Sequence, residues 1–323
     1  MGTINWGIIG CGDVTEKKSG PAFNKVNNSR LVAVMRRDAA KAEDYARRHG
    51  VPKWYSDATE LINDPEVKAI YIATPPNSHE QYTLEALRAG KPVYVEKPMT
   101  LSKESAEIMA KAAAESNVKL TVAHYRRGLP LFQKIKELID EKEIGEVRYA
   151  DLHMLQNAGS DLITQTDDNW RLNPAMSGGG LFHDLAPHQL DLMLFFFGSV
   201  SHSAGCAMNQ ARLYQADDLV SGSIQFTNGI LFKGLWCFSV PKEERLDLCT
   251  IMGAEGKISF SVFGNYYILT KNGSEEKVEF ELPENIQAPF IQKVVDYFLD
   301  KGPNPCSAET GVEVMRLLDT FTS

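Results

Sequence analysis

The stretch INWGIIGCGDVT, residues 4–15, joins a short apolar strand to a glycine-rich turn and the start of a helix. Glycines at Gly10-Cys11-Gly12 would let the backbone approach a pyrophosphate, which the amino end of the following helix would then face. The third small position of this pattern is Thr15 in place of Gly or Ala. The stretch predicts a dinucleotide-binding turn formed by Gly10, Cys11, Gly12, Asp13 and Val14.

A second strand is expected at Leu31–Met35, and Arg36 and Arg37 follow it directly. Arg36 stands where an acidic residue would hold the ribose hydroxyls of NAD. Guanidinium groups suit the 2′-phosphate of NADP, so the two arginines favour NADP over NAD. The alternative is a pair of solvated arginines at a helix start, with Asp38 as the N-cap.

The composition is that of an ordinary globular protein, with 323 residues, 43% hydrophobic and 24% charged, which is enough for two domains. The net charge of −8 argues against nucleic acid and anionic membrane as partners. No signal peptide is recognised, and no apolar run is long enough to span a bilayer. The five scattered cysteines show no zinc-binding spacing, so we expect a cytoplasmic protein without a metal.

Strands and helices alternate through the first part of the chain. Helices are expected at Asp38–His49, Asp57–Asn63, Ser78–Ala89 and Leu101–Ser116, and further strands at Ala69–Ala73, Pro92–Glu96 and Lys119–Ala123. This alternation is typical of a parallel, doubly wound sheet. Residues 1–123 are therefore expected to form a dinucleotide-binding Rossmann domain in a protein of the α/β class.

Two loops follow strands of this expected sheet. VYVEKP, residues 93–98, predicts a buried strand that stops at Glu96, Lys97 and Pro98, and it places a lysine where open α/β sheets carry their chemistry. The Lys97–Pro98 bond is a candidate cis peptide. In TPPNSH, residues 74–79, Asn77 or Ser78 is expected to cap the next helix, and His79 is either a structural hydrogen-bonding residue or a cofactor contact.

The pattern changes after residue 123. A helix at Leu131–Glu141 and a strand at Val147–Gln156 precede seven strand-like runs, two of them joined by Thr227-Asn228-Gly229 and two by Lys271-Asn272-Gly273. Closing helices are expected at Phe290–Leu299 and Glu309–Thr320. Residues 124–323 are expected to form an α/β domain with an open, mainly antiparallel sheet, one face of which takes helices while the other needs cover. The strand-like runs are Ser201–Leu213, Asp218–Phe226, Ile230–Ser239, Arg245–Gly253, Gly256–Val262, Tyr266–Thr270 and Glu276–Glu281.

The stretch GGGLFHDLAPHQLD, residues 178–191, offers a histidine between two carboxylates. A helix is expected to start just after Asp184, because Pro187 suits only a first turn. Asp184, His188 and Asp191 then fall near one face, where a histidine flanked by carboxylates is a tunable proton carrier. A metal site is disfavoured because no tight HxxxH pair is present, and a buried structural role for His188 is the remaining alternative.

Taken together, these motifs resemble the Gfo/Idh/MocA oxidoreductases over essentially the full length. GIIGCG at 7–12, TPPNSH at 74–79, EKP at 96–98, NWR at 169–171 and GGG…D…H..D at 178–191 match in order and spacing. The resemblance implies a Rossmann domain followed by an α/β domain whose open sheet commonly forms the oligomer interface. Apolar residues on both faces of one expected strand predict a homodimer or homotetramer, in which a second subunit covers the face that helices leave open: Ile230, Leu231, Phe232, Leu235, Trp236 and Phe238. The resemblance also implies hydride transfer between NADP or NAD and a sugar, cyclitol or related polyol.

The resemblance carries roles to residues of this chain. It implies that Lys97 binds or polarises the reacting oxygen, that His188 is the proton carrier and that Asp184 completes the catalytic site. It implies substrate contacts from Lys97, His124, Arg126, Asp184 and His188, although HYRR at 124–127 departs from the asparagine found in many members. Cofactor contacts are implied at Gly10, Cys11, Gly12, Asp13, Val14, Arg36, Arg37, Thr74, Pro75, Asn77, His79, Glu96, Lys97, Trp170 and Arg171.

Two other functions fit the same motifs. Some relatives use bound NAD transiently to cleave glycosides, and others are regulators that sense a dinucleotide without catalysis. Intact Lys97, Asp184 and His188 argue against the regulator. The expected chemistry is therefore hydride exchange at a carbinol carbon, with proton transfer at His188 and stabilisation of the developing oxyanion by Lys97.

Overall fold

The computed structural model describes residues 2–157, 159, 162 and 170–323. The chain forms two compact units, Met1–Leu129 with Pro283–Met315, and Pro130–Leu282 with Arg316–Ser323. The segment Pro283–Met315 thus returns to the first unit, whereas the sequence pattern places everything after residue 123 in one second domain. The reason is long-range packing: residues of this segment hydrogen-bond to Glu96 and to the end of the first helix, as described below.

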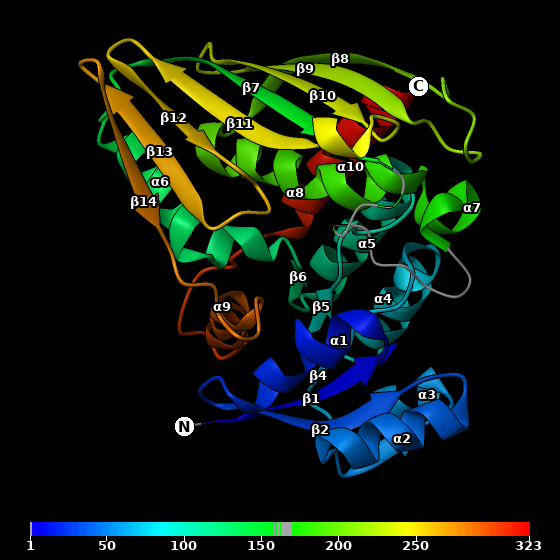
Figure 1. Cartoon of the computed structure of the whole chain (residues 1–323). Helices are drawn as coiled ribbons and strands as arrows, with labels where there is room; N and C mark the ends of the chain where they lie inside the picture. Colours follow the sequence, from blue (N-terminus) through cyan, green and yellow to red (C-terminus); the bar gives the residue numbers. More distant parts are fainter. Residues whose placement is uncertain (1, 158, 160–161, 163–169) are drawn as a thin grey trace. The chain divides into compact units, whose positions relative to one another are not determined.

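The first unit contains a six-stranded parallel sheet in the order β3-β2-β1-β4-β5-β6. This order is typical of dinucleotide-binding folds and places a topological switch point between β1 and β4. It confirms the expected doubly wound sheet (Figure 1). The strands are β1 (Ile4–Ile9), β2 (Ser29–Met35), β3 (Lys53–Tyr55), β4 (Ala69–Ile72), β5 (Val93–Val95) and β6 (Leu120–Val122).

Three helices of this unit begin where a short polar side chain satisfies a backbone N–H group of the first turn. Asp38, Asp57 and Ser102 each accept such a bond, from Lys41, Thr59 and Ser105. Ser78 occupies the N-cap position of α4, one of the two residues expected there, but its side chain makes no capping bond, because its hydroxyl lies 2.7 Å from Thr74 Oγ1 and 3.0 Å from the Pro75 carbonyl. The helices are α1 (Asp13–Lys17), α2 (Ala39–His49), α3 (Ala58–Asn63), α4 (His79–Arg88), α5 (Lys103–Ser116) and α9 (Ala288–Phe298), with 3-10 helices at Gly20–Asn24, Pro76–Ser78 and Tyr125–Gly128.

The second unit contains an eight-stranded sheet in the order β14-β13-β12-β11-β7-β10-β9-β8. All neighbouring strands in this sheet are antiparallel except the pair β7 and β10, which is parallel. The expected turns around Asn228 and Asn272 join β9 to β10 and β13 to β14. The strands are β7 (Val147–Leu155), β8 (Val200–Met208), β9 (Leu219–Phe226), β10 (Leu231–Cys237), β11 (Leu246–Gly253), β12 (Gly256–Phe260), β13 (Tyr266–Lys271) and β14 (Ser274–Glu279).

Helices α6 (Pro130–Asp140) and α8 (Gly180–Phe197) lie on one face of this sheet (Figure 1). The end of α10 (Ala308–Thr322) packs there too, because Gly205 and Gly222 are opposite each other on neighbouring strands and leave room for Phe321. A Cβ at Gly222 would lie 2.2 Å from the Phe321 ring. The glycines therefore allow close packing of helix on sheet. Shorter helices of the unit are α7 (Pro174–Ser177) and the 3-10 helices Trp170–Leu172 and Lys242–Glu244.

Helix α8 corrects one expectation, since it begins at Gly180 and contains Pro187 in its interior. An interior proline removes one helical hydrogen bond and costs about 3 kcal/mol. The helix is buried around almost its whole circumference, with Leu185, Leu190 and Phe197 among its core residues. Apolar burial of that extent outweighs the cost of the proline, so tertiary packing sets the start of the helix.

The other face of the eight-stranded sheet carries apolar side chains that remain partly exposed. Leu231, Leu246 and Leu248 are 42%, 39% and 37% exposed, whereas Phe232 and Trp236 on the opposite face are fully buried. Among the described residues, no helix is long and apolar enough to cross a membrane.

Candidate functional site

The glycine turn after β1 has a backbone that another group can approach closely. Gly10 has a φ of +94°, and a Cβ there would lie 2.7 Å from the Thr74 backbone nitrogen, so only glycine fits. At Gly12 an added Cβ would meet nothing within 4 Å, so this side of the turn is open. Thr15 is fully buried, and its hydroxyl donates to the Gly12 carbonyl at 2.7 Å. The threonine at the third position of the pattern therefore stabilises the turn by a hydrogen bond on its buried side.

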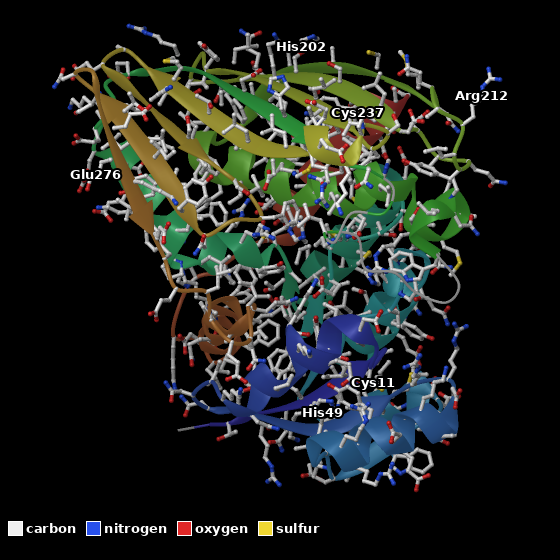
Figure 2. All side chains as sticks on the ribbon, in the orientation of Figure 1. Cys11, His49, His202, Arg212, Cys237 and Glu276 are labelled. Carbon is white, nitrogen blue, oxygen red and sulfur yellow. The ribbon has the colours of Figure 1, made fainter. Side chains whose placement is uncertain are left out.

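Arg36 follows β2 and contacts the same turn. Its Nη1 donates to the Cys11 carbonyl at 3.2 Å, while Arg37 is exposed. Burial raises the pKa of the Cys11 thiol to about 11, so this buried side chain stays uncharged at neutral pH. Figure 2 labels Cys11 at this position. A backbone that can be approached closely, with a guanidinium beside it, fits a bound dinucleotide.

His79 opens α4 and connects two loops at the carboxyl edge of the sheet. It is buried, with Nε2 2.7 Å from the Thr74 carbonyl oxygen and Nδ1 3.1 Å from the Pro98 carbonyl oxygen. Burial lowers its pKa to about 4, so the ring is neutral at pH 7. Both ring nitrogens face protein carbonyls, and the single N–H of the neutral ring donates to one of them, which is the geometry of a structural hydrogen-bonding residue. Asn77, in the 3-10 helix that precedes α4, is exposed.

Lys97 follows β5, and its peptide bond to Pro98 is cis. The preceding carboxylate of Glu96 is buried: Oε1 accepts the Tyr71 hydroxyl at 2.5 Å and Gln287 Nε2 at 2.7 Å, while Oε2 lies 3.2 Å from the Lys97 backbone nitrogen. Gln287 was not identified from the sequence, because it is 191 residues away from Glu96.

His124 and Arg126 belong to the same unit and follow β6. They are buried, with 1% and 7% of their surface exposed, and Arg126 Cζ lies 5.4 Å from the centre of the Tyr125 ring. Their expected substrate contacts stay a prediction.

In the second unit, Asp184 lies in the first turns of α8 and pairs with Arg171. Arg171 Nε donates to Asp184 Oδ2 at 3.1 Å, and the guanidinium carbon lies 4.4 Å from the centre of the Trp170 ring. The tryptophan and arginine of the NWR motif are thus connected to the carboxylate of the helix motif. Asn169 of that motif lies outside the described residues.

His188 is 5% exposed and sits on α8 one turn after Asp184. The ring of Phe263 stands edge-to-face against it, at 5.5 Å and 85°. Asp247 holds the loop of Phe263 by accepting the Ser261 hydroxyl and the Phe263 N–H, the latter at 2.7 Å. Phe263 was not identified from the sequence, since nothing in its surroundings distinguishes it from a core phenylalanine. Asp191, the last residue of the motif, is buried.

His183 lies on the same helix as His188 and is more deeply buried. It is 2% exposed, and burial lowers its pKa to about 4. Among the residues that the structure describes, no group of three His, Cys, Asp or Glu side chains is arranged to hold a metal ion.

Two groups of predicted site residues are in contact in the structure. The Glu96 carboxylate lies beside the Lys97 backbone in the first unit, and Arg171 pairs with Asp184 on the helix of His188 in the second.

The chain is similar to known proteins over nearly its whole length. Residues 4–124 match the model of an oxidoreductase family with an NAD-binding Rossmann fold, and residues 132–259 match the GFO/IDH/MocA C-terminal domain. Oxidoreductase P35 of Formosa agariphila is 49% identical over 318 residues, which are 98% of each chain. The 1,5-anhydro-D-fructose reductase of Ensifer adhaerens is 29% identical over 233 residues, 70% of this chain and 67% of that protein.

A solved structure agrees at the level of the fold. Levoglucosan dehydrogenase, in complex with NADH and levoglucosan, superposes with a TM-score of 0.87 over 99% of this chain and 96% of that chain, at 21% identity. With both domain models matched and a relative of nearly half identity along the full chain, this protein belongs to the Gfo/Idh/MocA family and is an NAD(P)-binding oxidoreductase.

Proposed function

We propose that the enzyme transfers a hydride between NADP or NAD and the CH–OH group of a sugar, cyclitol or related polyol, or the corresponding ketone. The observation that carries the proposal is the set of chemical groups in this family member: a lysine after β5, and Asp184 and His188 on one helix. Support for the substrate class comes from relatives named for sugar derivatives, 1,5-anhydro-D-fructose and levoglucosan.

The roles of the residues follow from their chemistry. The Lys97 ammonium is suited to donate to the reacting oxygen and stabilise its developing negative charge. His188, on the buried helix α8, accepts or returns the hydroxyl proton. Asp184, neutralised by Arg171, completes the site. The nicotinamide, when bound, supplies the hydride chemistry.

The cofactor would be held by the turn Gly10–Val14 and by the loops that carry Thr74 and Lys97. Arg36 is our basis for proposing NADP as the preferred cofactor, because its guanidinium lies beside the turn and suits a 2′-phosphate. His124 and Arg126 of the first unit, and Trp170 of the second, are further proposed contacts to cofactor or substrate.

We further propose a homodimer or homotetramer. The partly exposed leucines on β10 and β11 make an apolar face on the eight-stranded sheet, and a second copy of that face is a suitable cover.

The test is a screen of sugars, cyclitols and their ketones with NADP(H) and NAD(H), read by nicotinamide absorbance. We expect turnover with a polyol or sugar and a higher kcat/KM with NADP. Hydrolysis of a glycoside without net cofactor turnover would replace the proposal with a glycosidase, and cofactor binding without any turnover would replace it with a sensor.

A further inference from the structure

A buried polar network lies beneath Lys97. It connects Glu96 to two elements that are distant in sequence, β4 through Tyr71 and the start of α9 through Gln287. Glu96 is 5% exposed, and Tyr71 and Gln287 are fully buried. The Tyr94 hydroxyl donates to Gln287 Oε1 at 3.1 Å, which fixes the orientation of the amide and directs its NH₂ group at Glu96.

The two carboxylate oxygens of Glu96 have different hydrogen-bond partners. Oε1 accepts two bonds from the core, from Tyr71 at 2.5 Å and Gln287 at 2.7 Å, and Oε2 faces the Lys97 N–H at 3.2 Å. Burial and the adjacent carboxylate raise the pKa of Tyr71 well above its usual range, so its hydroxyl keeps the proton that it donates. A carboxylate with this many partners has one orientation.

We propose that Glu96 is a positioning residue: held by Tyr71 and Gln287, it fixes the main chain of Lys97 and thereby the direction of the lysine side chain. The resemblance implied a direct cofactor contact for Glu96, but its carboxylate is directed at protein donors inside the first unit. The inference rests on the proposed role of Lys97 in hydride transfer. It makes Pro283–Met315 a support for that lysine, since this segment supplies Gln287.

The segment also hydrogen-bonds to the end of α1, the helix that follows the glycine turn. Gln287 N–H donates to the Lys18 carbonyl at 3.1 Å, and Asn285 Nδ2 donates to the Lys17 carbonyl at 2.6 Å, both at the end of α1. The same short stretch of chain therefore contacts the end of α1 and the network behind Lys97. We therefore expect changes in this stretch to alter the position of Lys97 before they unfold the protein.

The test uses variants that remove the donors or the acceptor while keeping volume: Gln287→Met, Tyr71→Phe and Glu96→Met. The exchange variant Glu96→Gln/Gln287→Glu restores a donor at one residue and an acceptor at the other, and the new amide at position 96 keeps a carbonyl oxygen for the Lys97 N–H. Thr121→Val is the control, because it removes a different, partly buried hydrogen bond of the same sheet, 3.0 Å to Asn304.

Hydrogen exchange, measured on overlapping peptides that end on either side of Lys97, gives the exchange rate of its backbone amide without any substrate. We expect at least about tenfold faster exchange in Gln287→Met and Glu96→Met, as expected when a bond worth about 1.4 kcal/mol is lost. The exchange variant should return to within about threefold of the parent, and Thr121→Val should leave this amide unchanged.

Turnover and NADPH titration separate positioning from binding. We expect kcat to fall by about 10- to 100-fold in the donor-removing variants, with the Kd for NADPH changed by less than about threefold, and kcat to recover in the exchange variant. If Glu96→Met does not fold, Gln287→Met and Tyr71→Phe still decide the matter.

Unchanged Lys97 amide exchange in folded Gln287→Met protein would overturn the proposal, and so would lost NADPH affinity at unchanged exchange, which would make Glu96 a cofactor contact. If the parent oxidises no sugar or polyol, the proposed function fails while the exchange measurement still decides the role of Glu96.

Discussion

Arg171 Nε lies 3.1 Å from Asp184 Oδ2, and the two side chains are only 15% and 14% exposed. The bond joins a 3-10 helix, Trp170–Leu172, to the first turns of α8. The guanidinium also lies over the Trp170 ring. A carboxylate on the helix of His188 is thus held in place by a residue from a separate motif, and this pairing has consequences that can be measured.

Asp184→Asn should lower both stability and turnover, because the amide leaves the Arg171 charge without its counter-charge in a largely buried setting. We expect a loss of about 1–3 kcal/mol in the free energy of unfolding. Arg171→Leu should act in the same direction. A double-mutant cycle measured by denaturant unfolding gives the coupling, and additive effects of the two substitutions would show that the pair contributes nothing specific.

Arg36→Asp should weaken NADP binding more than NAD binding, because a contact to a 2′-phosphate is replaced by a negative charge. A loss of about 1.5–3 kcal/mol corresponds to about 10- to 150-fold in Kd. Arg30→Asp is the matched control, since it makes the same charge change near the start of β2, away from the turn. Fluorescence titration of both cofactors checks this, and a parent protein that binds NAD more tightly than NADP would contradict it.

His188→Ala should reduce turnover by about 10²- to 10⁴-fold, or roughly 3–5 kcal/mol of barrier, because a positioned proton carrier is lost. The pH profile of kcat should lose one limb. Lys97→Ala should reduce turnover severely with cofactor binding largely intact. His202→Ala is the control: this histidine is exposed on β8 of the same unit as His188, as Figure 2 shows. A folded His188→Ala enzyme with parental turnover would refute the assignment.

The stability of the protein should fall as the pH drops from about 6.5 to 4. In the folded state burial lowers the pKa of His79 and of His183 from about 6.5 to about 4. Between these values the unfolded chain binds more protons, so stability rises with pH in this window. Each histidine contributes a slope of up to about 1.4 kcal/mol per pH unit. His79→Gln should flatten the curve of melting temperature against pH, and an unchanged curve would argue against a neutral buried ring.

Leu248→Glu should shift the protein toward the monomer, because it introduces a charge into the apolar face of the eight-stranded sheet. Leu248 is 37% exposed and lies opposite His153 on the neighbouring strand. Leu213→Glu, at a leucine that is 62% exposed outside the strands, is the control. Sedimentation at micromolar concentration gives the oligomeric state, and a parent protein that is entirely monomeric would disprove assembly through this face.

Local features could be predicted from the sequence because their causes lie within a few residues. The order of strand, glycine turn and helix at residues 4–15 follows from glycine geometry and apolar runs, and the caps at Asp38 and Ser102 follow from side chains that bond their own helix. The alternation of strands and helices also sufficed for the parallel sheet. The edge strand Lys53–Tyr55 was missed because three residues carry too little pattern.

Long-range packing determined the features of the fold and the site that local sequence patterns could not predict. Burial of α8 on nearly all sides moved its start to Gly180 despite Pro187, and the return of Pro283–Met315 to the first unit brought Gln287 to Glu96. Phe263 reaches His188 through a loop that Asp247 holds. Each of these contacts joins residues far apart in the chain, so its stability comes from the folded core and leaves no periodic signal in the sequence around either partner.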